Sequence, residues 1–90
     1  MDIAHTPAAE RIARVLCGQR ISINAGGETE SASALVDDHW KDHLPDALAV
    51  LRTLREPDQQ MAAAGDPAIW EAMVLVAIEQ AKPKPQTVVL

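Results

Sequence analysis

The sequence predicts an all-α fold, a small bundle of about four helices with an extended loop between helix 1 and helix 2. Two pairs of residues, Thr6-Pro7 and Asp66-Pro67, join a capping side chain to a proline that can occupy the first helical position. Between these pairs, residues 44–54 carry leucine and alanine at spacings of three and four, the pattern of an amphipathic helix. Helix starts and helical periodicity therefore indicate the same fold class.

The first helix is predicted to begin at Thr6-Pro7 and to run to about Cys17, because Gly18 is a common helix stop. Its apolar stripe is expected to contain three large aliphatic side chains, Ile12, Val15 and Leu16. Cys17 at the end of this helix is expected to be a buried, inert thiol, since a helix C-terminus disfavours a thiolate.

The extended loop is predicted for residues 19–27. Residues 20–24 alternate apolar and polar side chains like a short strand, but no second alternating run exists for them to pair with. We therefore expect an extended connection whose isoleucines pack on the core, followed by a turn at Gly26-Gly27.

The second helix is predicted to begin between Glu28 and Ser33 and to continue to about His43. Pro45 disfavours helical geometry at the residue before it, and it can also open a new helix. The sequence leaves open whether the chain breaks or kinks there. The third helix is predicted from Pro45 to about Arg55.

A short helical segment is predicted over residues 59–64, ended by Gly65, and the last helix from Asp66-Pro67 to about Lys82. One face of the last helix carries Ile69, Trp70, Met73, Val76 and Ala77, and three more apolar residues widen that face almost all the way round: Val74, Leu75 and Ile78. A helix this apolar is expected to be central or covered by a second subunit. The third and last helices are expected to form the hydrophobic centre.

Length and composition predict one small domain over residues 1–82 and a flexible C-terminal tail over residues 83–90. Hydrophobic residues make up 48% of the 90 residues, but aromatic residues only 2%, with no Phe and no Tyr. Such a chain can bury few large side chains, and dimerisation is a common remedy for a small core. The sequence therefore predicts a homo-oligomer, specifically a homodimer.

The net charge of −5 argues against nucleic-acid and anionic-membrane partners, which select cationic surfaces. A single cysteine excludes an internal disulfide and a four-thiolate zinc site. The N-terminus lacks the basic and apolar regions of a signal peptide, so a cytoplasmic location is expected. No sequence motif points to a cofactor or to a catalytic residue.

Residues 37–43 concentrate two of the three histidines, one tryptophan and three carboxylates. His39 and His43 are four apart, so on a regular helix both lie on the apolar side with Trp40, and Asp42 lies at its border. Three hypotheses follow: packing histidines, an interaction surface, or a metal or acid/base site built on His39, Asp42 and His43, with Asp46 as a possible fourth member.

Trp40, Trp70 and Met73 are the predicted interface residues, because large side chains on apolar stripes serve as core or interface anchors. Acidic residues gather on the outer side of the second helix, which predicts a solvated face or a docking surface for a basic protein partner. Arg52 and Arg55 are expected to reach the acidic face of a neighbouring helix or subunit. The leading functional hypothesis is a non-enzymatic helical interaction or regulatory protein that self-associates.

Overall fold

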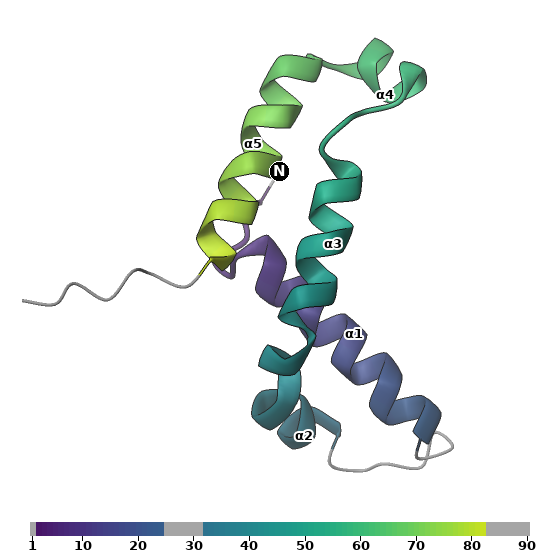
Figure 1. The fold of residues 1–90 in the computed structure, drawn as a ribbon, viewed down its shortest axis with the longest axis vertical. Coiled ribbons are helices and arrows are strands. Elements are labelled where there is room, and N and C mark those ends of the chain that lie inside the picture. Colours follow the sequence, from purple (N-terminus) through teal and green to yellow (C-terminus); the bar gives the residue numbers. More distant parts are fainter. Residues whose placement is uncertain (1, 25–31, 83–90) are drawn as a thin grey trace, which may run out of the picture.

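A computed structural model of the protein describes residues 2–24 and 32–82. This part of the chain folds into α1 (Ala8–Asn24), α2 (Ala32–His39), the 3-10 turn η1 (Trp40–His43), α3 (Leu44–Leu54), α4 (Gln59–Ala64) and α5 (Pro67–Ala81), and it contains no strand. The predicted all-α class is confirmed. Figure 1 shows α3 and α5 side by side, joined by α4 at one end. The helix α1 starts beside the lower end of α5 and crosses α3, and α2 lies at the opposite end.

The predicted starts of α4 and α5 are confirmed, because each has an aspartate at its N-cap. The carboxylate of Asp58 accepts a hydrogen bond of 2.9 Å from the backbone N–H of Met61. The carboxylate of Asp66 accepts from the backbone N–H groups of Ala68, at 2.9 Å, and Ile69, at 3.4 Å. These bonds satisfy N–H groups that would otherwise lack a partner in the first turn.

The predicted end of the first helix is wrong, because α1 continues through Gly18 to Asn24. A glycine inside a helix costs only about 0.5–1 kcal/mol relative to alanine, which packing can outweigh. A Cβ atom added to Gly18 would lie 3.8 Å from Cγ2 of Val36, so the glycine lies close to α2. Residues 20–24 therefore belong to a helix and not to an extended loop. The predicted turn at Gly26-Gly27 and the predicted tail, 83–90, lie outside the described residues.

Pro45 is placed at a break between two helices. The backbone leaves α-helical geometry at His39, whose φ and ψ are −122° and −3°, and again at His43, with −98° and 4°. The 3-10 turn η1 fills the interval, and α3 begins at Leu44 with the proline in its first turn. A proline there loses no helical hydrogen bond, because N–H groups in the first turn have no helical acceptor.

The core is formed by α1, α3 and α5, and it consists mostly of small side chains. The buried residues are Ala9, Ala13 and Cys17 of α1, Ala47 and Leu51 of α3, and Val74, Ala77 and Ile78 of α5. The α1 residues recur every four positions, so they form one narrow stripe. Small side chains in this stripe leave room for close helix packing.

The apolar stripe predicted for α1 is rotated relative to the stripe in the structure. Val15 is 63% exposed, whereas Ile12 and Leu16 are half-buried at the edges of the true stripe. The prediction followed the large aliphatic residues, and the helix instead buries its alanines and its cysteine.

The third and last helices do contribute to the hydrophobic centre, but α1 completes it. Leu51 packs with Val74, Ala77 and Ile78 of α5 and with Ala9 of α1 in one cluster. Half-buried residues that pack against this cluster include Ile12, Leu44, Leu48 and Trp70. The α5 helix lies at the edge of the molecule and not at its centre (Figure 1). One side of α5 therefore has no neighbour within the described residues.

Candidate functional site

The histidine and carboxylate run is divided by the end of α2. His39 is the last residue of that helix, and its side chain is 58% exposed instead of lying on an apolar face. Its Nδ1 atom is 3.7 Å from Oδ2 of Asp42. The two residues are three apart, and such residues eclipse one another in a 3-10 turn. The change from α to 3-10 geometry therefore brings Asp42, and not His43, next to His39.

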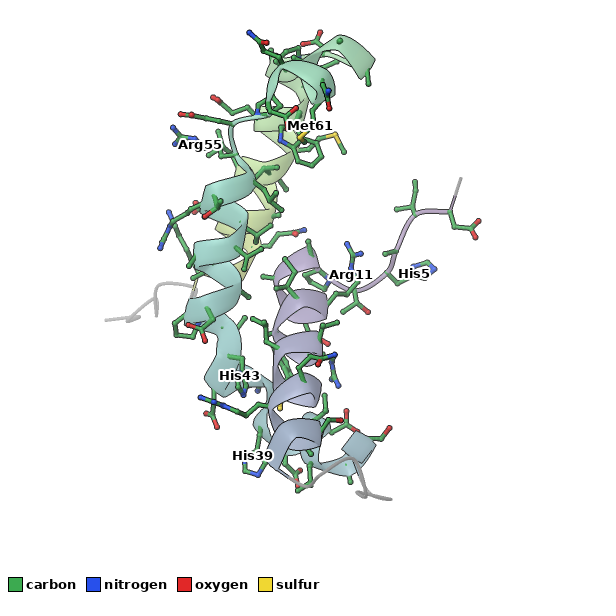
Figure 2. All side chains as sticks on the ribbon, turned by 90° about the vertical axis from the view of Figure 1, so that its right-hand side faces the viewer. His5, Arg11, His39, His43, Arg55 and Met61 are labelled. Atoms are coloured by element: carbon green, nitrogen blue, oxygen red, sulfur yellow. The ribbon has the colours of Figure 1, made fainter. Side chains whose placement is uncertain are left out.

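His43 lies in a different environment from His39. It is half-buried and lines a small pocket of about 240 Å³ with Leu16, Gln19, Arg20 and Asp46. Figure 2 shows the two histidines at separate heights along the molecule. No group of three His, Cys, Asp or Glu side chains in residues 2–24 and 32–82 is arranged to hold a metal ion. The predicted ligands His39, Asp42 and His43 are therefore not brought together as a set.

Trp40 contributes to a contact between α1 and the α2–η1 segment. The guanidinium of Arg14 lies 5.3 Å from the centre of the Trp40 ring, and the ammonium of Lys41 lies 5.8 Å from it. Both distances are within the range of a cation–π interaction. The Trp40 ring is therefore engaged in contacts within the chain.

Arg14 also joins two carboxylates. Its Nη1 donates to Oδ1 of Asp37 at 2.6 Å, and its Nε donates to Oε2 of Glu10 at 2.9 Å. The hydrogen bonds that Arg14 donates to Asp37, as the larger cause, and to Glu10 raise the pKa of its guanidinium. We call Arg14, Glu10, Asp37 and Trp40 the Arg14 cluster. The cluster connects α1 to the end of α2 through charges and an aromatic face.

The Arg14 cluster was only partly visible in the sequence. The four-residue spacing of Glu10 and Arg14 is typical of an ion pair along one helix. Asp37, however, was expected on an outer acidic face, and the structure turns it toward α1. Arg52 and Arg55 form no ion pair with any residue in the described part of the chain.

Trp70 connects α5 to the end of α3. The indole N–H donates a hydrogen bond of 2.7 Å to the carbonyl oxygen of Leu54, the last residue of α3. Carbonyl groups in the last turn of a helix have no helical donor, so this bond satisfies both groups. Trp70 is half-buried and packs against the core, and one edge of its side chain remains open to solvent.

Three apolar side chains of α5 face solvent in one line. Ile69, Met73 and Val76 are 59%, 64% and 57% exposed, and their spacings of four and three place them on one side of the helix. We call these three residues the α5 face. Because α5 buries Val74, Ala77 and Ile78 on another side, apolar residues occupy most of its circumference.

Two open grooves adjoin the α5 face, and Met73 lines both. The first, about 370 Å³, lies between α4 and α5, and its walls include Met61, Asp66, Ile69 and Trp70. We call it the α4 groove. The second, about 470 Å³, lies between α5 and the start of the described chain, which includes the segment before α1 and the first turn of α1. Its walls include Ile3, His5, Arg11 and Val76. We call it the N-terminal groove. In Figure 2, Met61 lies at one end of the molecule, and His5 and Arg11 lie near its middle.

The two grooves differ in charge. The charged side chain that lines the α4 groove is Asp66, whereas Arg11 and the titratable His5 line the N-terminal groove. Arg11 is oriented by a hydrogen bond of 3.0 Å from its Nε to the carbonyl oxygen of Thr6. The α5 face thus carries an acidic end and a basic end, with an uncharged centre.

Comparisons with known proteins found no matching family, no similar curated protein and no similar solved structure. None of the helices in the described parts of the chain combines the length and the apolar character needed to cross a bilayer. The surface that stands out chemically in the described residues is the α5 face with its two grooves, which offers apolar contact.

Proposed function

We propose that this protein is a non-enzymatic interaction module that self-associates through the α5 face. The main support is the number of large apolar side chains in the core compared with the number exposed on the α5 face. The core buries three of them, Leu51, Val74 and Ile78, and the α5 face leaves three others more than half exposed. Aligned apolar residues on a monomer surface commonly mark an interaction site.

The energetic argument follows from the size of the core. Burying one large aliphatic side chain contributes about 1.5–3 kcal/mol. Four of the eight residues that are buried in the described part of the chain are alanines, which contribute much less. Covering the α5 face would therefore add to stability on the scale of the core itself, which is a strong driving force for a chain of 90 residues.

The charge distribution supports the same surface. The protein carries a net charge of −5, so two copies repel unless they meet where charge is scarce. The centre of the α5 face is uncharged. Methionine at this centre also suits an interface, because its unbranched side chain adapts to a partner surface.

The test is the molar mass of the protein in solution, measured by size-exclusion chromatography with light scattering. We expect a dimer for the wild type at micromolar concentration and a monomer for Met73→Glu, which places a charge at the centre of the face. Leu75→Glu is the matched control, since Leu75 is an exposed residue of the same helix outside the face. A monomeric wild type, or equal dissociation by both variants, would contradict the proposal.

A further inference from the structure

We infer that the partner on the α5 face is a second copy of this chain, bound antiparallel about a two-fold axis that passes near Met73. This inference rests on the proposed self-association and adds its geometry. Most homodimers have such an axis, and it requires a self-complementary surface. The α5 face meets that requirement in both shape and charge.

The shape argument concerns the position of Met73. Ile69 precedes it by one turn and Val76 follows it by almost one turn, so the face is nearly symmetric about this residue. Each flank adjoins a groove, the α4 groove beside Ile69 and the N-terminal groove beside Val76. In an antiparallel pair, Ile69 of one copy lies opposite Val76 of the other. Each groove then receives an aliphatic side chain from the second copy.

The charge argument selects the antiparallel orientation. Antiparallel helices place the α4 groove of one copy against the N-terminal groove of the other. The Asp66 side chain of each copy therefore faces the Arg11 side chain of the other copy. A parallel pair would place Asp66 against Asp66 and Arg11 against Arg11. Juxtaposed like charges are unfavourable, and antiparallel helices also bring opposite ends of their dipoles together.

The area that a stable dimer must bury explains why two further apolar residues, Met61 and Ile3, are exposed beside the α5 face. A stable dimer buries roughly 800 Å² on each partner. A 15-residue helix is only about 22 Å long and about 10 Å wide, so α5 alone is too small. The walls of the grooves supply Met61, which is 40% exposed, and Ile3, which at 88% is the most exposed large apolar residue in the part of the chain that the structure describes. Both would be covered in the antiparallel dimer.

Disulfide cross-linking measures the orientation directly. Facing Cα atoms of two packed helices lie about 4–5 Å apart, within the range that a disulfide requires. Met73→Cys is expected to cross-link to itself. Ile69→Cys and Val76→Cys alone are not, because the two copies of each residue lie roughly 10 Å apart along an antiparallel pair. A mixture of these two variants is expected to give about ten-fold more product than either alone.

The controls separate this inference from the proposed function. Cys17 is buried, so the wild type should give little background, and Leu75→Cys lies outside the face. Strong self-cross-linking of Ile69→Cys in a protein that is dimeric by light scattering would overturn the antiparallel geometry alone. A protein that is monomeric by light scattering would overturn the self-association as well.

A charge variant tests the pairing of the two grooves. Arg11→Glu puts an acid opposite Asp66 on both sides of the axis, so we expect dimer dissociation to be about ten-fold easier. Arg52→Glu changes the net charge equally but lines neither groove, so its effect should be smaller. The effect of Arg11→Glu should also decrease in high salt. Equal effects of the two variants would overturn the contact between Arg11 and Asp66.

Discussion

The Arg14 cluster and the α5 face are opposite kinds of surface within one small protein. At the cluster, a cation contacts two carboxylates and an aromatic ring, all from the same chain. At the α5 face, three apolar side chains lie exposed to solvent. The charged cluster is thus completed within the chain, and the apolar α5 face is left open.

The difference shows how the two regions depend on helix packing. The helix α1 contacts both α2 and η1. Gly18 lies close to Val36 there, and Arg14 bonds Asp37 across the same pair of helices. The α5 helix instead buries aliphatic residues on one side and exposes the apolar residues of the α5 face on another. We expect stability to depend more on the sparse aliphatic core than on the charges, and four experiments test that order.

The largest effect is expected from Leu51→Ala, at the centre of the core. Removing a buried leucine side chain should lower the free energy of unfolding by about 2–5 kcal/mol. Urea denaturation followed by circular dichroism measures this change. Leu54→Ala on the same helix is the control, because Leu54 is 41% exposed and should matter much less. Similar losses for both variants would show that Leu51 is not part of a defined core.

A smaller effect is expected from Trp70→Phe, which keeps an aromatic ring but removes the indole N–H. The loss of its hydrogen bond to the carbonyl oxygen of Leu54 should cost about 1 kcal/mol. Thermal unfolding of the variant measures it. An unchanged midpoint would show that the end of α3 is not held by this bond.

Gly18→Ala is expected to stabilise the protein by roughly 0.5–1 kcal/mol, because alanine is the better residue inside a helix. The new methyl group would meet Val36 at an ordinary contact distance of 3.8 Å. The midpoint of thermal unfolding should therefore rise. A fall would indicate that α1 ends at Gly18, as the sequence pattern suggests.

The smallest effect is expected at the Arg14 cluster, whose cation is open to solvent. A double-mutant cycle with Arg14→Gln and Asp37→Asn should give a weakly favourable coupling that decreases as salt is added. Because the pKa of Arg14 is raised in the folded protein, its ionisation stabilises the fold at every pH below the ordinary guanidinium pKa. This stabilisation is lost only as the pH rises above that value. The Arg14 ionisation itself therefore adds no pH dependence near neutrality. A coupling insensitive to salt would contradict an exposed ion pair.

The sequence predicted the features that depend on neighbouring residues. Asp66, a predicted capping residue, caps α5 because its carboxylate reaches N–H groups two and three residues ahead. Prediction from the sequence failed where contact with a distant segment determines the local backbone conformation. Gly18 continues a helix that packs on α2, and His39 is exposed because the chain changes from α to 3-10 geometry there.

The candidate site was predicted in part for the same reason. Met73 was predicted as an interface residue because large side chains on apolar stripes serve as anchors. The structure leaves its side chain 64% exposed, and its contact with a partner stays a prediction. The contribution of Arg11 and Ile3 could not be inferred, since both reach the groove from a segment some seventy residues earlier in the sequence. Likewise, Asp37 and Arg14 are 23 residues apart and meet only in the folded chain.

The placement of the two tryptophans has an optical consequence. Trp40 lies beneath two cations in the charged region, and Trp70 lies beside the α5 face. The chain has no tyrosine, so these two indoles dominate its intrinsic fluorescence. A variant that keeps only one of them emits from one region alone. The protein thus carries a separate fluorescent reporter for each end, and dimer formation should change the emission of Trp70 far more than that of Trp40.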